Sequence, residues 1–472
     1  MYGALEEERM KQSGKTQVRA WFHGHCHGKV LAGTLAMLFA GLAGESACAV
    51  LDKGMTEHLL DNGLTVVVVE DHWHPLVALE VCYRVGARND PPGKQGLSHL
   101  LEHLTFRGRG APPAESTDRA ERSGRAHATT NHDTTCYSSS IIRDDLNAML
   151  ESEAERMKQL DISSEDLERE KTIVTRERSQ LVAGDTWRNF LEEVDTTAYR
   201  LHPYRFPTLG WPETLAQITL DDIHAHFATY YTPANAVVVV VGDAKRQDLV
   251  AAIQEFFGSA PTRTHPAPPR FVEPAQSGER RLLMAPYAAP RLVAAYHTPP
   301  FSSPDRAALE VVTEVLAGSS NARLPALMYA QDIAEDIGVE YDPYVLDPGL
   351  FYIKVAMGPR IDFPRTGEAV DDVLWHLRED GLTPAELNTA KKRLLLDFYL
   401  DRGLRARATR LAQYVMLKAL SQAQHYTDEI QAVTTADVQR VITTYCAPDT
   451  RVVAVTGMAH QEQERRHTGV QP

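Results

Sequence analysis

Residues 96–106 read Gly96-Leu-Ser-His-Leu-Leu-Glu-His-Leu-Thr-Phe106 and place two histidines and a glutamate on one expected helix. Side chains four apart lie on the same face of an α-helix, so His99 and His103 can share one ligand. Imidazole is a common zinc ligand, and catalytic zinc takes three protein ligands plus a water. Glu102 stands beside His103, where it can hold that water and accept its proton. The helix itself is predicted by leucines at helical spacing, at Leu97, Leu100, Leu101 and Leu104.

The size and charge of the chain narrow the class of protein. Its 472 residues are enough for two or more domains with large cores. The formal charge is −14, and the part after residue 49 holds 44 basic and 59 acidic residues. An acidic body argues against nucleic-acid binding. It favours neutral or basic substrates, although acidic surfaces also serve solubility alone.

The first 49 residues have the pattern of a targeting segment. Arg19 and Lys29 precede an apolar run over residues 30–43, which is too short to span a bilayer. Ala47-Cys48-Ala49 then matches the A-x-A cleavage pattern. This predicts a bacterial Sec-type signal peptide over residues 1–49, a periplasmic or secreted protein, and no stable membrane insertion after cleavage. An uncleaved membrane anchor is the alternative.

Cleavage at that site would leave three cysteines, Cys82, Cys136 and Cys446. An odd and sparse set of cysteines is not a disulfide framework. Cys82 and Cys136 lie in strand-like runs and are expected to be buried thiols. A single disulfide is the alternative, and the sequence does not decide between the two.

The rest of the chain alternates strand and helix patterns, and one unit of it occurs twice. A helix, a proline, a buried strand and a glycine recur at a constant offset of 215 residues. A constant offset over such a unit indicates an internal duplication. The matched positions are Thr219, Asp222, Tyr230, Pro233 and Gly242 in the first copy and Thr434, Asp437, Tyr445, Pro448 and Gly457 in the second.

The duplication predicts an α+β fold of two homologous domains, each a mostly antiparallel sheet packed with helices, together forming one half of a clamshell. The expected zinc-binding domain covers residues 50–259, and its homologue without zinc covers residues 279–460. Residues 260–278 are rich in proline and are expected to form a stiff, exposed linker. Residues 461–472 form a polar tail that is expected to be disordered.

A third zinc ligand is expected on a second helix. Glu170 and Glu177 are seven residues apart and therefore share a helical face. One of them can bind zinc while the other bonds a histidine or the water. The alternative is that both are ordinary solvated glutamates. The second copy has no H-x-x-E-H, which indicates a site placed on one half of a duplicated scaffold.

Longer stretches around these residues resemble the pitrilysin-type zinc peptidases, or inverzincins, in the branch of mitochondrial processing peptidase and its bacterial relatives. The likeness covers roughly residues 57–459. The stretches that carry it are residues 86–108, residues 124–130 with 133–137, the paired glutamates, His202-Pro-Tyr204 and a block ending at Asn235.

The resemblance implies a zinc metalloendopeptidase with one zinc ion per chain. Its ligands would be His99, His103 and Glu177, with Glu102 as the general base and Glu170 as a supporting residue behind the ligands. These five residues would activate water for peptide hydrolysis.

The resemblance also implies how the peptide substrate binds. An extended or unfolded peptide would add as a strand beside the segment of His127, Ala128 and Thr129, through main-chain hydrogen bonds. His127 stands where the family usually has asparagine, so its role is either a substrate contact or that of a polar rim residue.

One departure from the family pattern concerns partners. Active single-chain relatives carry an Arg and a Tyr in the C-terminal half, and the aligned positions here are Met328 and Glu335, neither of which can stabilise an oxyanion. Arg323 matches a different arginine. This favours the zinc-bearing subunit of a heterodimer whose homologous partner chain supplies the Arg/Tyr pair. A homodimer with other donors is one alternative, and a non-catalytic scaffold or partner subunit is another.

Overall fold

The computed structural model describes residues 54–107, 126–184, 186–263, 270–284, 290–357 and 362–456. The expected signal peptide, the expected C-terminal tail and the centre of the expected linker therefore lie outside the described residues. The predicted domain boundaries stay predictions. No helix in the described ranges is both long enough and apolar enough to cross a bilayer.

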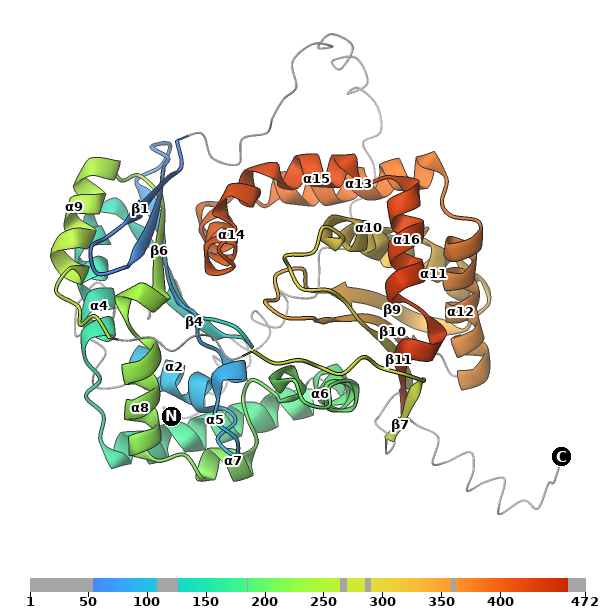
Figure 1. The fold of residues 1–472 in the computed structure, drawn as a ribbon, viewed down its shortest axis with the longest axis horizontal. Helices are drawn as coiled ribbons and strands as arrows, with labels where there is room; N and C mark the ends of the chain where they lie inside the picture. The colour runs from blue at the N-terminus through green and yellow to red at the C-terminus, as the bar shows by residue number, and fades with distance from the viewer. Residues whose placement is uncertain are drawn as a thin grey trace, which may run out of the picture. The chain divides into compact units, whose positions relative to one another are not determined.

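The first sheet contains six strands in the order β1-β2-β6-β3-β5-β4. Three of them, β1, β6 and β4, are labelled in Figure 1. All neighbours are antiparallel except β2 and β6, which run parallel. β4 is an outer strand of this sheet. The strands are β1 (Thr56–Leu59), β2 (Thr65–Glu70), β3 (Leu76–Tyr83), β4 (Ala126–Thr130), β5 (Thr135–Ile142) and β6 (Ala236–Gly242).

The second sheet repeats this topology with five strands in the order β7-β11-β8-β10-β9. Its one parallel pair, β7 and β11, corresponds to β2 and β6. This repetition confirms the predicted α+β fold with an internal duplication. The strands are β7 (Arg280–Met284), β8 (Arg291–His297), β9 (Ala334–Tyr341), β10 (Leu350–Met357) and β11 (Arg451–Thr456).

The helices of the first half lie between β3 and β7 along the chain, and those of the second half lie between β8 and β11. In the first half they are α2 (Leu97–Arg107), α4 (Leu146–Lys158), α5 (Ser164–Gly184), α6 (Thr186–Ala198), α7 (Pro212–Ala216), α8 (Leu220–Tyr230) and α9 (Arg246–Phe257). In the second half they are α10 (Arg306–Ala317), α11 (Arg323–Ala330), α12 (Phe363–Glu379), α13 (Pro384–Leu400), α14 (Leu404–Met416), α15 (Tyr426–Ala432) and α16 (Thr435–Tyr445).

The duplicated unit is preserved down to its helix caps. The Thr219 hydroxyl caps α8 by accepting from the Asp222 N–H, and the Asp222 carboxylate accepts from the Thr219 N–H. Thr434 and Asp437 form the same box at α16. Such a box satisfies two backbone donors that a helix start leaves without partners.

The buried strand β6 shows that the first sheet has two apolar faces. Its side chains alternate between the faces because successive residues of a strand point to opposite sides. Val238 and Val240 pack with the helices of the first half. Val237 and Val239 pack into the core of the second half. The helix that covers this second face is α14, which contacts β3, β5 and β6.

The second sheet is covered in the same way by a helix of the first half. α6 contacts β7, β8 and β11. Phe190 and Val194 of α6 are completely buried against Val293 of β8 and Val452 of β11. Since α6 and α14 occupy equivalent places in the duplication, each half provides one helix to the other half's sheet (Figure 1).

Arg84 reinforces the contact between the halves. Its guanidinium donates to the carbonyls of Val415 and Met416 at 3.1 and 3.3 Å. These carbonyls lie at the C-terminal end of α14, where backbone acceptors lack helical partners and a cation is favourable.

Cys82 and Cys136 form a disulfide between β3 and β5. The expectation of two buried thiols was therefore wrong for this pair, and the alternative of a single bridge is what the structure shows. The reason is register, because Cys82 and Cys136 are direct partners across the two antiparallel strands. Cys446 is a free, buried cysteine, and burial raises the pKa of its thiol to about 12.

Replacing Phe190 with alanine tests the exchange of helices. We expect Phe190→Ala to lower the free energy of unfolding by about 3–5 kcal/mol, because it leaves a cavity between α6 and the second sheet. Urea unfolding followed by far-UV circular dichroism measures this. Leu201→Ala, at an exposed position nearby, should change it by no more than about 0.5 kcal/mol. A loss below about 1 kcal/mol for Phe190→Ala would contradict the packing described here.

Candidate functional site

The helix α2 is fixed at its start by Asp90. The Asp90 carboxylate accepts from the N–H groups of Gly96 and Ser98 at 2.8 and 2.9 Å, and from the Ser98 hydroxyl at 2.6 Å. Gly96 has φ +94°, and a Cβ there would lie 2.7 Å from the carbonyl oxygen of Leu209. Only glycine fits this turn without strain. The direction in which α2 leaves the turn is thereby set.

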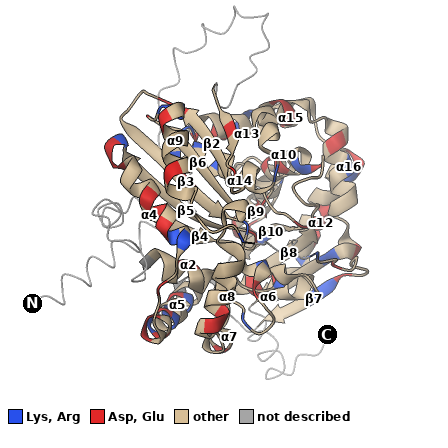
Figure 2. Ribbon diagram, turned by 60° about the vertical axis from the view of Figure 1, so that its left-hand side comes forward, with Lys and Arg blue, Asp and Glu red and all other residues tan. Residues whose placement is uncertain are grey.

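The apolar face of α2 holds the helix in the core. All four leucines of the sequence pattern are buried, with at most 1% of each side chain exposed. The histidine-bearing face consequently points towards α5, which α2 contacts. In the ribbon of Figure 2, acidic positions in red and basic positions in blue are mixed along α5.

The structure brings His99, His103 and Glu177 together. One donor atom from each of them lies within 4.8 Å of the others. The Glu177 Oε2 is 3.2 Å from the His103 Nε2 and 4.0 Å from the His99 Nε2. Bonds of about 2.0–2.2 Å to a tetrahedral zinc place two ligand atoms about 3.4 Å apart. The separation between Glu177 and His103 is close to this value and the separation between Glu177 and His99 is larger, so a small side-chain shift would bring all three donor atoms around one zinc ion.

Glu170 lies on the other side of His103. Its Oε2 is 3.4 Å from the His103 Nδ1, and its side chain is buried. His103 is thus held between two carboxylates of α5 that are two helical turns apart. A carboxylate behind a metal-binding imidazole fixes the orientation of the ring.

The two imidazoles differ in their electrostatics. Burial lowers the pKa of His99 to about 4, and the charge of His103 adds to that shift. Burial also opposes a charge on His103, but the carboxylates of Glu170 and Glu177 outweigh burial and raise its pKa to about 9. Burial would raise the pKa values of both glutamates, yet His103 holds them below the usual value. The His99 imidazole is therefore neutral at pH 7, whereas the His103 imidazole carries a proton that a metal ion would have to displace.

Glu102 is buried beside these residues and is held by a residue that the sequence analysis did not single out. The Thr130 hydroxyl donates to the Glu102 Oε2 at 2.6 Å. Thr130 was part of the stretch that carried the family resemblance, but no role was assigned to it. Its spacing of two from Ala128 was the available signal, because residues two apart share a face of a strand.

The predicted substrate segment lies on β4, at the edge of the first sheet. In the hairpin of β4 and β5, the Asn131 N–H donates to the Thr134 carbonyl. From this pair onward, hydrogen-bonded and non-hydrogen-bonded residue pairs alternate along the two antiparallel strands. The N–H and C=O of Ala128 consequently point away from β5, to the free edge. The backbone groups of His127 and Thr129 point towards β5, and their side chains lie on the face opposite to that of Ala128 and Thr130.

The two positions aligned with the Arg/Tyr pair supply no oxyanion donor in the structure. Met328 is fully buried in α11, and Glu335 lies exposed in β9. Arg323 binds Glu386, with 2.9 Å between the Nε and Oε1 atoms, and so serves contacts between helices.

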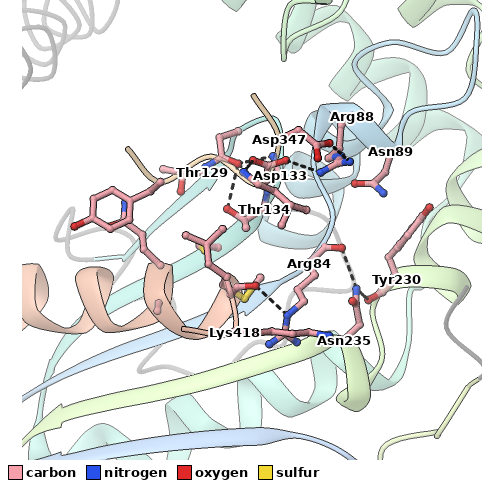
Figure 3. Close-up of a pocket in the computed structure, with 18 of the residues that line it drawn as sticks. Arg84, Arg88, Asn89, Thr129, Asp133, Thr134, Tyr230, Asn235, Asp347 and Lys418 are labelled. Carbon is pink, nitrogen blue, oxygen red and sulfur yellow. Dashed lines mark hydrogen bonds and ion pairs between the residues drawn. The ribbon is translucent and has the colours of Figure 1, made fainter. Parts of the chain in front are cut away.

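A cavity of about 740 Å³ lies between the halves (Figure 3). Its lining includes Arg84 from the first half and Lys418 from the second, with Thr129 among the predicted substrate residues. None of the three candidate zinc ligands lines it. The cavity and the candidate metal site are therefore separate.

Two protein-family descriptions match the chain, one after the other. The family described as insulinase (peptidase family M16) matches residues 65–210. The family described as peptidase M16 inactive domain matches residues 217–394. The candidate zinc ligands all fall in the first match.

The chain is similar to proteins that are named proteases. It is 27% identical to the zinc protease PqqE of Helicobacter pylori over 346 residues, which are 72% of this chain and 78% of that protein. It is 25% identical to the probable mitochondrial-processing peptidase subunit beta of Arabidopsis thaliana over 309 residues, 62% of this chain and 57% of that protein.

Solved structures share the fold. The crystal structure of a protease from Helicobacter pylori has a TM-score of 0.80 at 25% identity, covering 85% of this chain and 99% of that one. The first half of the periplasmic protease PqqL from Escherichia coli has a TM-score of 0.70 at 17% identity, covering 86% of this chain and 92% of that one. The second likeness concerns the fold alone.

Substitutions on α5 test the assignment of the ligands. We expect Glu177→Gln to abolish stoichiometric zinc binding and Glu170→Gln to weaken zinc affinity about 10–100-fold, since the first removes a ligand and the second a support. Zinc content after dialysis and competition with a chelator measure both. Glu168→Gln, exposed on the same helix, should bind zinc normally. Full zinc content in Glu177→Gln would show that Glu177 is not a ligand.

Proposed function

We propose that this chain, which belongs to the M16 family of peptidases, is a zinc-dependent endopeptidase that cleaves extended or unfolded peptides. The observation that carries the proposal is the meeting of His99, His103 and Glu177 beside the buried carboxylate of Glu102. The zinc proteases among the relatives support it.

The residues of the site would have different roles in peptide hydrolysis. Zinc, when bound, would supply a Lewis acid that polarises the scissile carbonyl and makes a water acidic. Glu102 would take a proton from the attacking water and pass it to the leaving nitrogen as the peptide bond breaks. Glu170 would hold His103 in orientation throughout. Glu102 thus ends the reaction in the state in which it began.

Substrate binding would use the free edge of β4. The outward N–H and C=O of Ala128 can pair with a peptide that extends the first sheet by one strand. Main-chain pairing of this kind requires an extended substrate and reads little of its sequence. His127 and Thr129 would then contribute to the rim of the binding site.

A partner chain would complete the site. Met328 and Glu335 offer no oxyanion donor, which supports a heterodimer in which a homologous chain contributes the Arg/Tyr pair. One relative is named as a subunit of a processing peptidase. A homodimer with other donors is the alternative.

The compartment proposed for the protein is the periplasm or the outside of the cell. The Cys82–Cys136 disulfide supports this, because such bonds persist in oxidising compartments.

A catalytically silent scaffold subunit is the rival function. The family match described as an inactive domain covers residues 217–394, a stretch that lacks H-x-x-E-H. The first half keeps both histidines, the glutamate and the base, which favours an enzyme.

Glu102→Gln separates enzyme from scaffold. We expect the variant to keep its zinc and to lose peptide hydrolysis by at least about 100-fold, because an amide cannot accept the proton from water. Zinc analysis and cleavage of a fluorogenic peptide library measure the two properties. Glu168→Gln is the matched control and should stay active. Undiminished hydrolysis by Glu102→Gln would rule out the assigned base.

Adding the partner tests the heterodimer. We expect the purified chain to cleave peptides slowly and to gain activity when mixed with the homologous chain that co-purifies with it from its host. The reason is that an oxyanion donor contributes about 3–4 kcal/mol to catalysis, a factor of about 100–1,000 in rate. Activity should saturate at equal amounts of both chains. Full activity of the chain alone would refute this arrangement.

A further inference from the structure

We propose that Thr130 is a positioning residue that holds the Glu102 carboxylate while the same strand holds the substrate. This inference rests on the proposed function, in which Glu102 is the general base. It assigns to Thr130 a role that follows from its contacts and not from the family pattern.

The hydrogen of the Thr130 hydroxyl has two acceptors within reach. The Thr130 hydroxyl lies 2.6 Å from the Glu102 Oε2 and 3.3 Å from the Thr135 hydroxyl oxygen. Thr135 uses its own hydroxyl hydrogen on the Val85 carbonyl at 2.9 Å. The single hydrogen of Thr130 is therefore given to the carboxylate, which is both nearer and charged.

The strand β4 carries both Thr130 and Ala128, the residue proposed to pair with the peptide. Thr130 and Ala128 are two residues apart in β4, so both side chains lie on the face that turns towards α2. Ala128 also presents its backbone groups at the sheet edge. The strand β4 thus binds the peptide through Ala128 and holds the Glu102 carboxylate through Thr130, so a shift of β4 would move both together.

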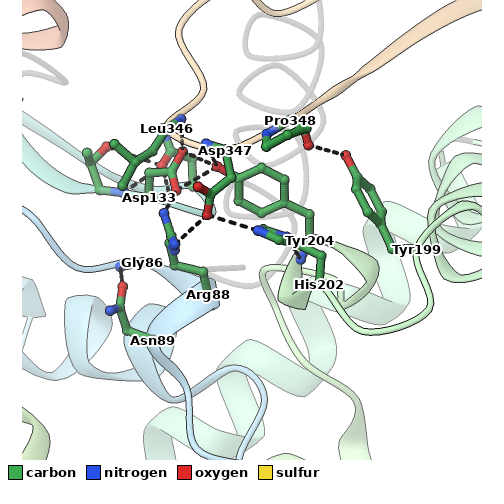
Figure 4. Close-up of polar contacts among 12 residues, drawn as sticks. Gly86, Arg88, Asn89, Asp133, Tyr199, His202, Tyr204, Leu346, Asp347 and Pro348 are labelled. Atoms are coloured by element: carbon green, nitrogen blue, oxygen red, sulfur yellow. Dashed lines mark hydrogen bonds and ion pairs between the residues drawn. The ribbon is translucent and has the colours of Figure 1, made fainter. Parts of the chain in front are cut away.

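The tip of the hairpin formed by β4 and β5 is held by polar contacts, which Figure 4 shows. The Asp133 carboxylate accepts from the Tyr204 hydroxyl at 2.6 and 2.8 Å and from the Arg88 guanidinium at 3.2 Å. It also accepts from the Leu346 N–H of the second half at 3.0 Å. Asp347 binds Arg88 and His202 from the same side. The tip next to Thr130 is therefore fixed by both halves of the chain.

These contacts give Thr130 a function that a structural hydroxyl lacks. A hydroxyl that holds one carboxylate oxygen restricts the rotation of the Glu102 side chain at the moment of proton transfer. Its removal should impair the chemical step and leave the binding of peptide and metal intact, because neither Ala128 nor the zinc ligands change.

The test compares Thr130→Val with Thr130→Ser in the chain assembled with its partner. We expect Thr130→Val to lower kcat about tenfold with KM and zinc content unchanged, as the loss of a hydrogen bond to a charged group implies. Thr130→Ser keeps the hydroxyl and should restore kcat to within about twofold. Thr134→Val, in the same hairpin but bonded only to Asn131, is the matched control and should behave as the unaltered chain.

A second measurement does not depend on turnover. In crystal structures of the zinc-free protein, the unaltered chain should show the Glu102 carboxylate in one orientation. The Thr130→Val variant should show that carboxylate displaced from this orientation. An unchanged Glu102 side chain, or an unchanged kcat in Thr130→Val, would overturn the inference. A parallel loss of zinc or a raised KM would overturn it as well, since it would give Thr130 a structural role. Activity retained by Glu102→Gln would instead overturn the proposed function.

Discussion

The two halves of this chain each leave one apolar face of a sheet uncovered, and the burial of those faces organises the rest of the structure. Val237 and Val239 of β6 require a cover that the first half does not provide, and α14 supplies it. α6 does the same for the second sheet. Fully burying such aliphatic side chains contributes about 1.5–3 kcal/mol each. The halves are therefore parts of one folding unit, although they descend from a repeated sequence.

The second half also contacts the hairpin beside the candidate site. The hairpin that carries Thr130 ends at Asp133, which contacts Leu346 of the second half. The helix α10 follows β8 along the chain, as α2 follows β3, the counterpart of β8 in the first sheet. In place of the two histidines it carries a buried ion pair of Arg306 and Glu310, with 3.0 Å between Nη1 and Oε1. In the first copy His103 of α2 meets two carboxylates of α5 at the candidate metal site, whereas in the second copy Arg306 and Glu310 of α10 pair with each other.

The sequence predicted the elements that depend on local pattern. The leucines of α2 fixed which face carries His99 and His103, and the offset repeat predicted two like sheets. Spacing placed Glu170 and Glu177 on one helical face, but their order around His103 depends on how α5 lies against α2, which family resemblance suggested. The disulfide was missed because it depends on the register of β3 against β5. Thr130 was missed because the leucine spacing predicts the helix α2 but not how that helix lies against β4. The contact between Thr130 and Glu102 depends on that packing.

The exchange of α6 and α14 has a consequence for biogenesis. A nascent chain completes β6 at residue 242, whereas the helix that covers the valines of that strand begins at residue 404. During synthesis or export, the first half would emerge with an aggregation-prone surface for more than 160 residues. A chaperone that holds the unfinished chain, or passage through a translocon before folding, would protect this surface until the C-terminal helices arrive.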